Sequence, residues 1–359
     1  MDNAAACEIF NEDLSTLDLH LQPIATHLAD ETITEIVVNR PGELLLERRD
    51  GWETVQSEAL TYGWCDGLAM LLRNLANQNL TEDWPLLGAM LPGGLRVQVA
   101  IPPAIEAGKI SLTIRRPIGK VLSMDEIIDG GAFGCTRCEQ SLISDPEERT
   151  RIEAGLPDGE RNLLAQFRKH DWAAFFKTAV EGRKNIVSSG STGSGKTTLS
   201  NALAAMIPLN ERIITVEDVA EMRLPHHNQT NLFYPKGANG VSKLKARDLL
   251  EATLRMRPDR VLLAELRGEE TFFFIQNVLN SGHPGTITTV HATRAKLAFK
   301  RLALLIKGSA EGAGLALAEI TENLYALVDI VIQMERQLDG RRVVTEVYYD
   351  PAFAARQLG

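Results

Sequence analysis

The feature that most constrains this chain is a glycine-rich segment, Gly190-Ser-Thr-Gly-Ser-Gly-Lys-Thr197, which follows an apolar run and precedes a helix-forming run. Its spacing, G-x-x-x-x-G-K-T, is that of a phosphate-binding loop between a strand and a helix. The glycines let the backbone curl so that several N–H groups point at one phosphate, and the helix N-terminus adds partial positive charge. The motif therefore predicts a nucleotide-binding α/β core.

The loop supplies most of the residues that we expect to touch the nucleotide. Lys196 is expected to reach the β and γ phosphates, and Thr197 to ligate Mg²⁺. The predicted contact residues of the loop are Gly190, Ser191, Thr192, Gly193, Ser194, Gly195, Lys196, Thr197 and Thr198. No N-K-x-D motif for guanine recognition occurs in the sequence, which disfavours a GTPase. The expected cofactors are accordingly ATP and Mg²⁺.

Strand and helix patterns alternate strictly around this loop. Apolar strand-like runs occur at 185–189, 212–216, 260–264 and 286–290, with helical runs at 196–206, 246–256 and 269–280 between them. Such alternation implies a parallel sheet covered by helices on both faces. We therefore predict an α/β fold in which residues 162–359 form a RecA-like ATPase domain with a mainly parallel sheet.

Residues 1–117 show a different pattern, in which short strands and turns surround one helix. Strand-like runs occur at 33–38, 43–47, 95–101 and 110–115, with a return strand from Trp52, and one helical face is made by Trp64, Leu68, Leu71, Leu72 and Leu75. This pattern predicts an N-terminal α+β domain over residues 1–117. Residues 118–161 carry scattered glycines and prolines among acids with little periodicity, so they are predicted to form a long linker.

The charge is distributed unevenly along the chain. There are 38 Lys and Arg against 47 Asp and Glu, which gives a net charge of −9. Residues 1–117 hold 8 basic and 17 acidic residues, which accounts for all of that charge and leaves 30 of each in the remainder. An acidic domain repels phosphate backbones, and the remainder has no basic run, so no specific nucleic-acid site is evident.

Nothing in the sequence predicts a membrane span or a zinc site. The best apolar run, 325–334, is interrupted by Asp329 and falls short of the roughly 18 residues that a membrane helix needs. Cys135 and Cys138 form a single C-x-x-C with no second pair or histidine at zinc spacing. We expect reduced thiols and a cytoplasmic protein.

Carboxylates follow two of the predicted strands, at the edge where doubly wound sheets bind ligands. The strand from Arg260 ends in Glu265, but Ala264 occupies the position where an aspartate usually holds the water shell of magnesium. Glu217 ends the strand at 212–216, although acids at such positions are also common as helix caps. His291 follows the strand at 286–290 and is expected to sense the phosphates.

Taken together, these motifs in this order resemble the secretion ATPase superfamily, and specifically the hexameric traffic ATPases of type IV secretion and conjugation systems. The resemblance covers nearly the whole chain: residues 190–197 match the Walker A motif, 217–221 the Asp box, 254–268 the Walker B region and 281–292 the His box of that superfamily. The superfamily departs from the usual Walker B motif in the same way, with no aspartate at the position of Ala264.

The resemblance implies roles for particular side chains. By resemblance, Glu217 polarises the attacking water and Glu265 holds water around Mg²⁺, although the reverse assignment stays open. Segments 91–96 and 110–117 resemble those whose arginines reach the nucleotide phosphates from the N-terminal domain. The resemblance implies Arg96 and Arg115 as catalytic residues and Arg116 as a nucleotide-binding residue. It also implies Arg255 and Arg257 as nucleotide-binding residues at the boundary with a neighbouring subunit, although either could equally be a solvated or salt-bridged arginine.

The implied function is ATP hydrolysis that powers substrate translocation or pilus assembly by a type IV secretion machine, through domain movement in a hexameric ring. The implied partners are other copies of the chain and inner-membrane subunits of the machine, met by peripheral association with the inner membrane. Type II secretion ATPases typically carry two zinc-binding C-x-x-C pairs, and this chain has one. Motors of type IV pili lack the zinc and stay open as an alternative, as does a DNA-translocating RecA-like motor.

Overall fold

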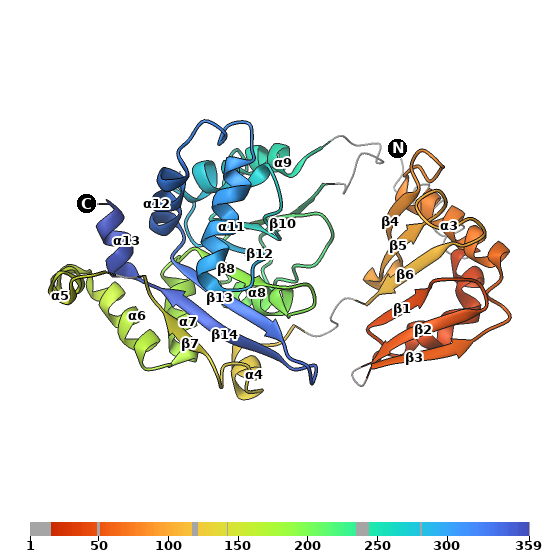
Figure 1. The fold of residues 1–359 in the computed structure, drawn as a ribbon, viewed down its shortest axis with the longest axis horizontal. Coiled ribbons are helices and arrows are strands. Elements are labelled where there is room, and N and C mark those ends of the chain that lie inside the picture. Colours follow the sequence, from red (N-terminus) through yellow and green to blue (C-terminus); the bar gives the residue numbers. More distant parts are fainter. Residues whose placement is uncertain are drawn as a thin grey trace. The chain divides into compact units, whose positions relative to one another are not determined.

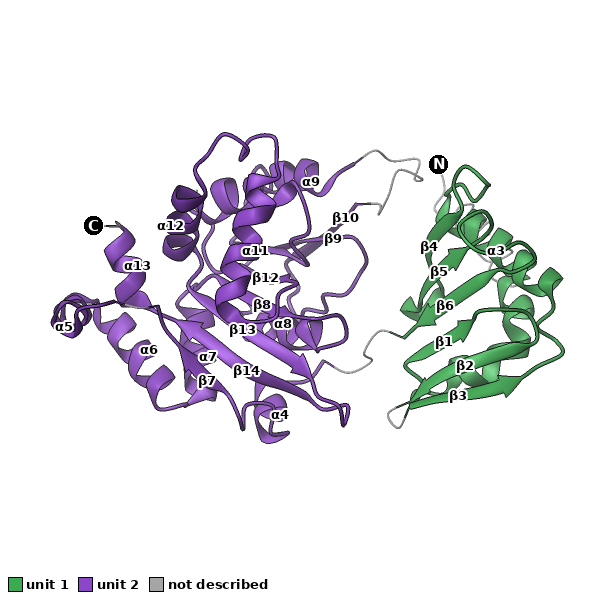
Figure 2. Ribbon diagram, viewed as in Figure 1, with its two compact units in different colours: residues 1–119, 235–243 green, residues 120–234, 244–359 purple. Residues whose placement is uncertain are grey.

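The computed structural model describes residues 16–48, 51–116, 121–141, 143–234, 244–280 and 282–358. The chain divides into two compact units, residues 1–119 with 235–243 and residues 120–234 with 244–359 (Figure 2). Each unit has a sheet of its own and a hydrophobic core of its own. The two units are therefore described separately.

The first unit is an antiparallel sheet packed on one face against helices (Figure 1). Its strands lie in the order β3-β2-β1-β6-β5-β4, and their bounds are β1 Glu35–Val38, β2 Glu43–Arg48, β3 Gly51–Gln56, β4 Leu86–Met90, β5 Arg96–Ala100 and β6 Ser111–Arg115. The helical elements are η1 Gln22–Ile24, α2 Ala25–Ala29, α3 Tyr62–Ala76 and η2 Pro92–Gly94. The α+β pattern predicted for this region is confirmed.

Both ends of helix α3 are set by capping residues. Thr61 caps its N-terminus by accepting a hydrogen bond from the Trp64 backbone N–H at 3.1 Å, and Asn77 ends it in a left-handed conformation with φ +48°. Trp64, Leu68 and Leu72 are buried, as the helical spacing predicted. They pack on alternate residues of the strands, such as Leu44 and Leu46 of β2, so that the residues between them, such as Leu45, lie on the opposite face of the sheet.

The second unit contains an eight-stranded, mainly parallel sheet in the order β10-β9-β11-β12-β8-β13-β14-β7. Only the pairing of β13 with β14 is antiparallel within this sheet as described. The strand bounds are β7 Arg137–Glu139, β8 Ile186–Gly190, β9 Ile213–Glu217, β10 Gln229–Phe233, β11 Arg260–Leu263, β12 Ile287–Val290, β13 Ile330–Arg336 and β14 Arg342–Tyr349. The predicted parallel core is confirmed.

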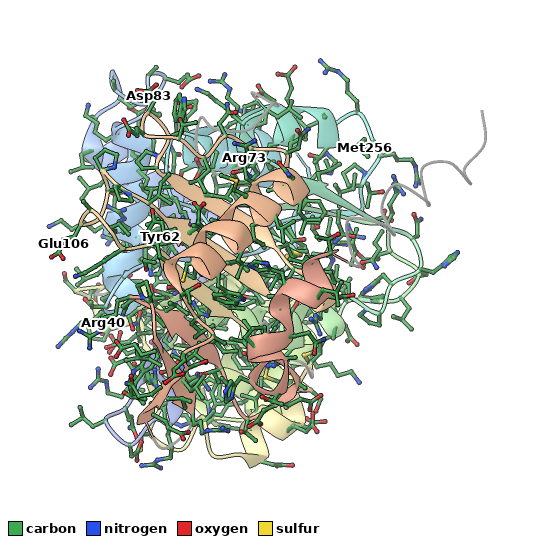
Figure 3. All side chains as sticks on the ribbon, turned by 90° about the vertical axis from the view of Figure 1, so that its right-hand side faces the viewer. Arg40, Tyr62, Arg73, Asp83, Glu106 and Met256 are labelled. Atoms are coloured by element: carbon green, nitrogen blue, oxygen red, sulfur yellow. The ribbon has the colours of Figure 1, made fainter. Side chains whose placement is uncertain are left out.

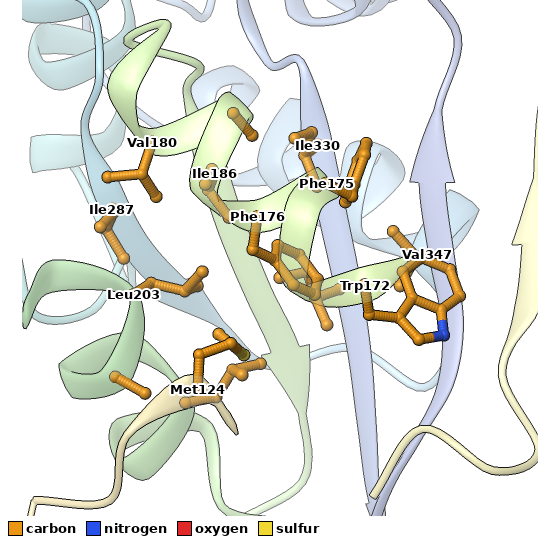
Figure 4. Packing of buried hydrophobic residues seen from close by; sticks show 14 of the residues in the cluster. Met124, Trp172, Phe175, Phe176, Val180, Ile186, Leu203, Ile287, Ile330 and Val347 are labelled. Carbon is orange, nitrogen blue, oxygen red and sulfur yellow. The ribbon is translucent and has the colours of Figure 1, made fainter. Parts of the chain in front are cut away.

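Helices cover both faces of this sheet, because neighbouring residues of its strands belong to different hydrophobic clusters. Ile186 of β8 lies in the cluster with α6, α7 and α8, whereas Val187 lies in the cluster with α9, α11 and α12. Figure 4 shows the first cluster, where aromatic side chains of α7 pack over Ile186 and Ile330. The helix bounds are α4 Met124–Asp129, α5 Pro146–Gly155, α6 Asp158–Arg168, α7 Trp172–Glu181, α8 Lys196–Ala205, α9 Ala246–Thr253, α10 Glu270–Phe273, α11 Ala295–Lys307, α12 Leu317–Leu327 and α13 Pro351–Leu358.

Two segments differ from their prediction. Residues 121–161, within the segment predicted as a linker, carry α4, β7 and α5, and they belong to the second unit. The scattered turn-forming residues are caps of short elements: Ser123 and Glu126 form a capping box on α4, and Pro146 opens α5. The predicted helix 269–280 is helical, but residues 274–279 of it, labelled η3, form a π-helix after α10.

The edge of the parallel sheet where the strands begin is held by a buried ion pair. Arg260 at the start of β11 is fully buried, and its Nε and Nη2 atoms donate to Glu211 at 2.7 and 3.1 Å. A buried pair of this geometry is costly to break by removing one partner. In the described part of the chain, no helix is both long enough and apolar enough to cross a membrane.

Candidate active site

The phosphate-binding loop joins β8 to α8, as its sequence predicted. Gly190, Gly193 and Gly195 have φ angles of +156°, +76° and +98°, which side chains with a Cβ rarely adopt. A Cβ on Gly190 would lie 2.4 Å from the backbone oxygen of Met334 on β13. Glycine at this position is therefore required both by the turn and by the neighbouring strand.

Lys196 begins helix α8 and is buried. Its Nζ donates hydrogen bonds to the backbone oxygens of Gly190 and Ser191, each at 2.8 Å, and lies 3.4 Å from His291 Nδ1. The ammonium group is thus held by the loop whose backbone amides would surround a phosphate. This placement agrees with the predicted role of Lys196 as a phosphate ligand.

The strand-end residues meet at one edge of the sheet. Strands β9, β11, β12 and β8 are neighbours in that order and run parallel, so Glu217, Glu265 and His291 all follow strands at the edge where the phosphate-binding loop follows β8. This common edge was expected from the sequence pattern. It brings an acid, an imidazole and the loop together.

A chain of polar contacts crosses this edge. The His291 Nδ1 atom lies 3.0 Å from the backbone oxygen of Gly190, and its Nε2 atom lies 2.9 Å from Glu265 Oε1. Glu265 Oε2 accepts a hydrogen bond from Arg267 Nη2 at 2.6 Å, and Arg267 Nη1 donates to Asp218 Oδ2 at 2.6 Å. The hydrogen bond to Glu265 and the charge of Asp218 raise the pKa of Arg267, so this guanidinium stays charged between the two acids.

Glu217 is placed differently from Glu265. Its side chain is fully buried, and Oε1 accepts a hydrogen bond from Thr215 Oγ1 at 2.7 Å. Its Oε2 accepts from the backbone N–H groups of Glu221 at 2.7 Å and Met222 at 2.8 Å. Oε2 thus holds the turn that follows β9 and Oε1 is bound to a residue of β9 itself, so this placement does not fit the water-polarising role predicted for Glu217.

Glu221 belongs to the acidic cluster recognised in the sequence, but no role was predicted for it. Its Oε2 atom accepts a hydrogen bond from Thr197 Oγ1 at 2.9 Å. Thr197 is the residue predicted to ligate the metal ion, so a carboxylate lies beside that hydroxyl. Residue 221 is in a loop without regular periodicity, and its distance from Thr197 could not be inferred from spacing.

Arg96 and Arg115 lie directly opposite each other on the neighbouring strands β5 and β6 of the first unit. Arg115 also pairs with Glu35 of β1, at 3.4 Å between Nε and Oε1. Arg116 instead donates to backbone oxygens, including that of Ile33 at 3.2 Å, and ties together the chain before β1. The predicted nucleotide contact of Arg116 does not fit this placement.

The two arginines predicted at a subunit boundary precede β11. Arg255 is exposed and pairs with Glu251 at 3.1 Å, and Arg257 is exposed with a left-handed φ of +52°. Both residues lie just before the start of β11, whereas the phosphate-binding loop follows the end of β8. In a parallel sheet these positions are at opposite edges. A contact of either side chain with the nucleotide of its own chain is not supported by this arrangement.

Two residues that the sequence did not single out pack on the phosphate-binding loop. Arg342 at the start of β14 donates from Nε to the backbone oxygen of Gly193 at 3.1 Å. The Cε atom of Met334 and the Cδ atom of Arg342 lie 3.2 and 3.0 Å from the place where a Cβ on Gly195 would be. Both come from the β13–β14 hairpin, far along the chain, which is why local sequence reasoning missed them.

Comparison with known proteins agrees with this geometry. A family model described as type II/IV secretion system protein matches residues 163–347. The type IV secretion system protein VirB11 of Bartonella henselae is 42% identical over 341 residues, which are 95% of this chain and 95% of that protein. The chain belongs to the VirB11-type secretion ATPases.

Other relatives place the chain in the same branch of the superfamily. The type IV secretion system protein PtlH of Bordetella pertussis is 38% identical over 339 residues, 93% of this chain and 95% of that protein. The crystal structure of the VirB11 ATPase of Brucella suis in complex with sulphate has a TM-score of 0.52 and 38% identity, and the match covers 95% of this chain and 99% of that one. The predicted type IV branch and the ATPase activity are confirmed.

A pilus motor shares the fold at lower identity. The structure of the pilus retraction motor PilT with bound ADP has a TM-score of 0.58 and 17% identity, and the match covers 94% of this chain and 87% of that one. Identity this low shows a common fold and nothing more specific. The relatives at about 40% identity therefore decide the family.

Proposed function

We propose that this ATPase is a Mg²⁺-dependent motor of a type IV secretion machine, which works as a hexameric ring at the cytoplasmic face of the inner membrane. The observation that carries the proposal is the contact of His291 with two other residues at one sheet edge. Its Nδ1 atom lies 3.4 Å from Lys196 Nζ, and its Nε2 atom lies 2.9 Å from Glu265 Oε1. A cation for the phosphates, a group that contacts the phosphate-binding loop and an acid for water are the components that phosphoryl transfer to water needs.

The residues at this edge fit a magnesium ion. Mg²⁺ takes oxygen ligands, keeps several waters and is usually held by one or two protein side chains together with substrate phosphates. Thr197 offers a hydroxyl beside the carboxylate of Glu221, and Glu265 offers a second carboxylate at the same edge. When bound, the ion would neutralise charge on the phosphates; the protein's own contribution is to hold the hydroxyl, the acids and the phosphates in place.

The geometry favours Glu265 over Glu217 as the residue that orients and deprotonates the attacking water. Glu265 contacts His291, which in turn contacts the backbone of Gly190 in the phosphate-binding loop. Both oxygens of Glu265 are also engaged, by His291 and Arg267, but its side chain is partly exposed. Glu217 is fully buried, and its oxygens are bound to its own turn and to Thr215. We therefore assign activation of the attacking water to Glu265, the alternative that the sequence left open. We assign Glu217 to holding the turn after β9.

Glutamine substitutions separate these two roles. Glu265→Gln is expected to slow ATP hydrolysis by about 10² to 10⁴-fold, the usual contribution of a general base, while ATP still binds. Glu217→Gln is expected to lower the free energy of unfolding by about 1–3 kcal/mol, because an amide nitrogen would face buried N–H donors. Single-turnover hydrolysis and thermal melting of both variants test the assignment. A Glu217→Gln protein that melts like wild type and traps bound ATP would restore the role predicted from the sequence.

The first unit is proposed to act on the same nucleotide through Arg96 and Arg115. Their cross-strand pairing places two guanidinium-bearing residues at one position of the open sheet face, in a unit that is otherwise acidic. We propose that this unit closes over ATP and releases after hydrolysis, which would supply the mechanical stroke. Residues 121–161 move with the second unit in this proposal, because they belong to it.

Solution measurements test the proposed motor as a whole. Wild-type protein is expected to hydrolyse ATP with Mg²⁺ and to lose this activity in EDTA, and its mass in solution is expected to reach that of six chains of 39.5 kDa. Flotation with vesicles that contain acidic lipids tests the peripheral association. A fully active monomer would contradict the ring, and stimulation of hydrolysis by DNA would favour a DNA-translocating motor instead.

A further inference from the structure

We propose that Gln333 and Glu346 are positioning residues for His291, because they anchor the segment that joins His291 to helix α11. Both residues are buried, and they lie directly opposite each other on the neighbouring strands β13 and β14. The inference rests on the proposed function, in which His291 takes part in hydrolysis at the phosphate-binding loop. It names the side chains through which the fold fixes this imidazole.

The sheet holds His291 from its N-terminal side only. The preceding residues, Ile287–Val290, form β12 and pair with β8 along their whole length. After His291 the chain leaves the sheet, and Thr293 and Arg294 are exposed, so packing against the core does not fix them. The restraint on the imidazole from this side therefore comes from the polar contacts of residues 292–295.

Gln333 holds the residue that follows His291. Its Nε2 atom donates hydrogen bonds to the backbone oxygens of Ala292 at 3.3 Å and Met334 at 3.4 Å. Both partners are acceptors, so only the amide nitrogen of Gln333 can bind them. Within the described residues, the buried amide oxygen of Gln333 has no hydrogen-bond partner. Such an unpaired group is costly and calls for an explanation, and the contact of the nitrogen with Ala292 supplies one.

Glu346 holds the start of helix α11. Arg294, the N-cap residue of this helix, makes no side-chain capping bond in the described structure. Instead, Glu346 Oε2 accepts the backbone N–H of Ala295, the first residue of the helix, at 2.8 Å. The other oxygen, Oε1, accepts from Arg137 Nη2 of β7 at 2.6 Å. An acid at this place satisfies a helix N–H that has no partner within the helix, and it interacts favourably with the helix dipole.

The two side chains belong to a polar row that crosses the sheet. Register pairing joins four polar residues on β8, β13, β14 and β7, namely Ser189, Gln333, Glu346 and Arg137. Ser189 directly precedes Gly190 of the phosphate-binding loop, and the backbone oxygen of Gly190 lies 3.0 Å from His291 Nδ1. The imidazole therefore lies between a loop and a segment that are both tied to this row, so the row sets the distance between them.

A double-mutant cycle tests whether Gln333 acts through His291. Gln333→Met keeps the length of the side chain and removes its hydrogen bonds. We expect it to lower ATP turnover by about 10- to 100-fold, because a small displacement of a group at the reacting phosphates can have an effect of that size. In the His291→Ala background the same substitution is expected to change turnover by less than about twofold, since the group that it positions is gone.

The affinity for ADP separates positioning from a general distortion of the sheet. Met334 pairs in register with Gly190, so a substitution that disturbed β13 would disturb the phosphate-binding loop as well. Gln333→Met is expected to bind a fluorescent ADP analogue within about twofold of the wild-type affinity while its kcat falls.

Gln166→Met provides the matched control. Gln166 lies on α6, and its buried amide oxygen likewise has no partner within the described residues. We expect its turnover and its ADP affinity to equal those of wild type.

Glu346 provides a second test. Glu346→Met removes the acceptor at the start of α11, whereas the amide oxygen in Glu346→Gln can still accept the Ala295 N–H. Arg137 is released in both variants, but 63% of its side chain is exposed and can be solvated by water. We therefore expect Glu346→Met to lower turnover and Glu346→Gln to retain a larger share of it. Equal turnover in the two variants would contradict the assignment of Glu346.

The outcomes separate the inference from the proposed function. Wild-type turnover in Gln333→Met, or an equal loss in the presence and absence of His291, would overturn the inference. A folded Gln333→Met protein that no longer binds ADP would overturn it too, because Gln333 would then support the loop itself. If Gln333→Met does not fold, as judged by thermal melting, Gln333→Asn decides by the same criteria, since its shorter amide cannot reach Ala292. Wild-type turnover in His291→Ala would instead refute the part that the proposed function gives to His291.

Discussion

Replacing Lys196 with alanine is expected to reduce ATP turnover by about 10² to 10³-fold, the usual cost of removing one group that stabilises charge in a transition state. The Lys196 ammonium lies inside the phosphate-binding loop, 2.8 Å from each of two backbone oxygens. Loss of those two hydrogen bonds is expected to cost about 1–3 kcal/mol of stability, which a unit with so large a core tolerates. Steady-state phosphate release and thermal melting measure the two effects.

Lys177→Ala provides the matched control for this substitution. Lys177 is an exposed lysine on α7 in the same unit, so its loss changes the net charge by the same amount. We expect its turnover and melting temperature to equal those of wild type. Wild-type turnover in Lys196→Ala itself would show that the loop does not bind the reacting phosphates.

Arg115→Ala and Arg96→Ala are each expected to slow hydrolysis by about 10³-fold or more if the first unit closes over the nucleotide, since an arginine acting on a transferring phosphate is worth about 10³ to 10⁵ in turnover. The alternative is that Arg115 only pairs with Glu35, a half-exposed contact at 3.4 Å. Such a pair contributes about 0–1 kcal/mol to stability and nothing to turnover. The melting temperature is therefore expected to stay nearly unchanged while the rate falls.

Arg40→Ala is the control for the two arginine variants. Arg40 lies in the same unit (Figure 3) and pairs with Glu43 at 2.8 Å, with 64% of its side chain exposed. Its replacement removes one positive charge and one surface ion pair, so turnover is expected to stay at the wild-type level. Activity within a factor of two of wild type in both Arg96→Ala and Arg115→Ala would show that the first unit contributes nothing to hydrolysis.

The parts of the site that the sequence predicted are those tied to a strand end. The phosphate-binding loop, Glu265 and His291 could be placed together because parallel strands end at one edge of a sheet. Glu217 lies at the predicted edge, but spacing cannot say which way a carboxylate faces, and its oxygens are bound to Thr215 and to the turn after β9. The contact of Glu221 with Thr197 depends on the path of an irregular loop. Such a loop has no repeating hydrophobic pattern from which the position of a side chain could be predicted.

The different placements of Arg115 and Arg116 could have been expected from the sequence. Arg115 and Arg116 are consecutive residues at the end of a strand, and successive side chains of a strand point to opposite faces. Only one of the two could therefore lie on the face shared with Arg96. The structure places Arg115 there and uses Arg116 to bind backbone oxygens before β1.

The predicted linker shows a different limit. Its elements are short, with six residues in α4, three in β7 and ten in α5, so none is long enough to establish a hydrophobic period. Apolar residues of α4 and of the turn after it are nevertheless buried: Met124, Ile127 and Phe133 join the cluster beneath the parallel sheet. Membership of that cluster, which depends on contacts far along the chain, assigns the segment to the second unit.

Because the first unit has a separate core, the chain could be split into two fragments that are studied together as a mixture. Among the described residues, those of its buried core lie between Leu17 and Ile114, and the phosphate-binding edge lies in the second unit. A protein with two self-contained cores can be divided between them without exposing either. A fragment that ends at residue 119 could then be mixed at rising concentration with a fragment that begins at residue 120. The concentration at which the mixture reaches the ATP turnover of the intact chain would be the effective concentration that the covalent link between the units provides.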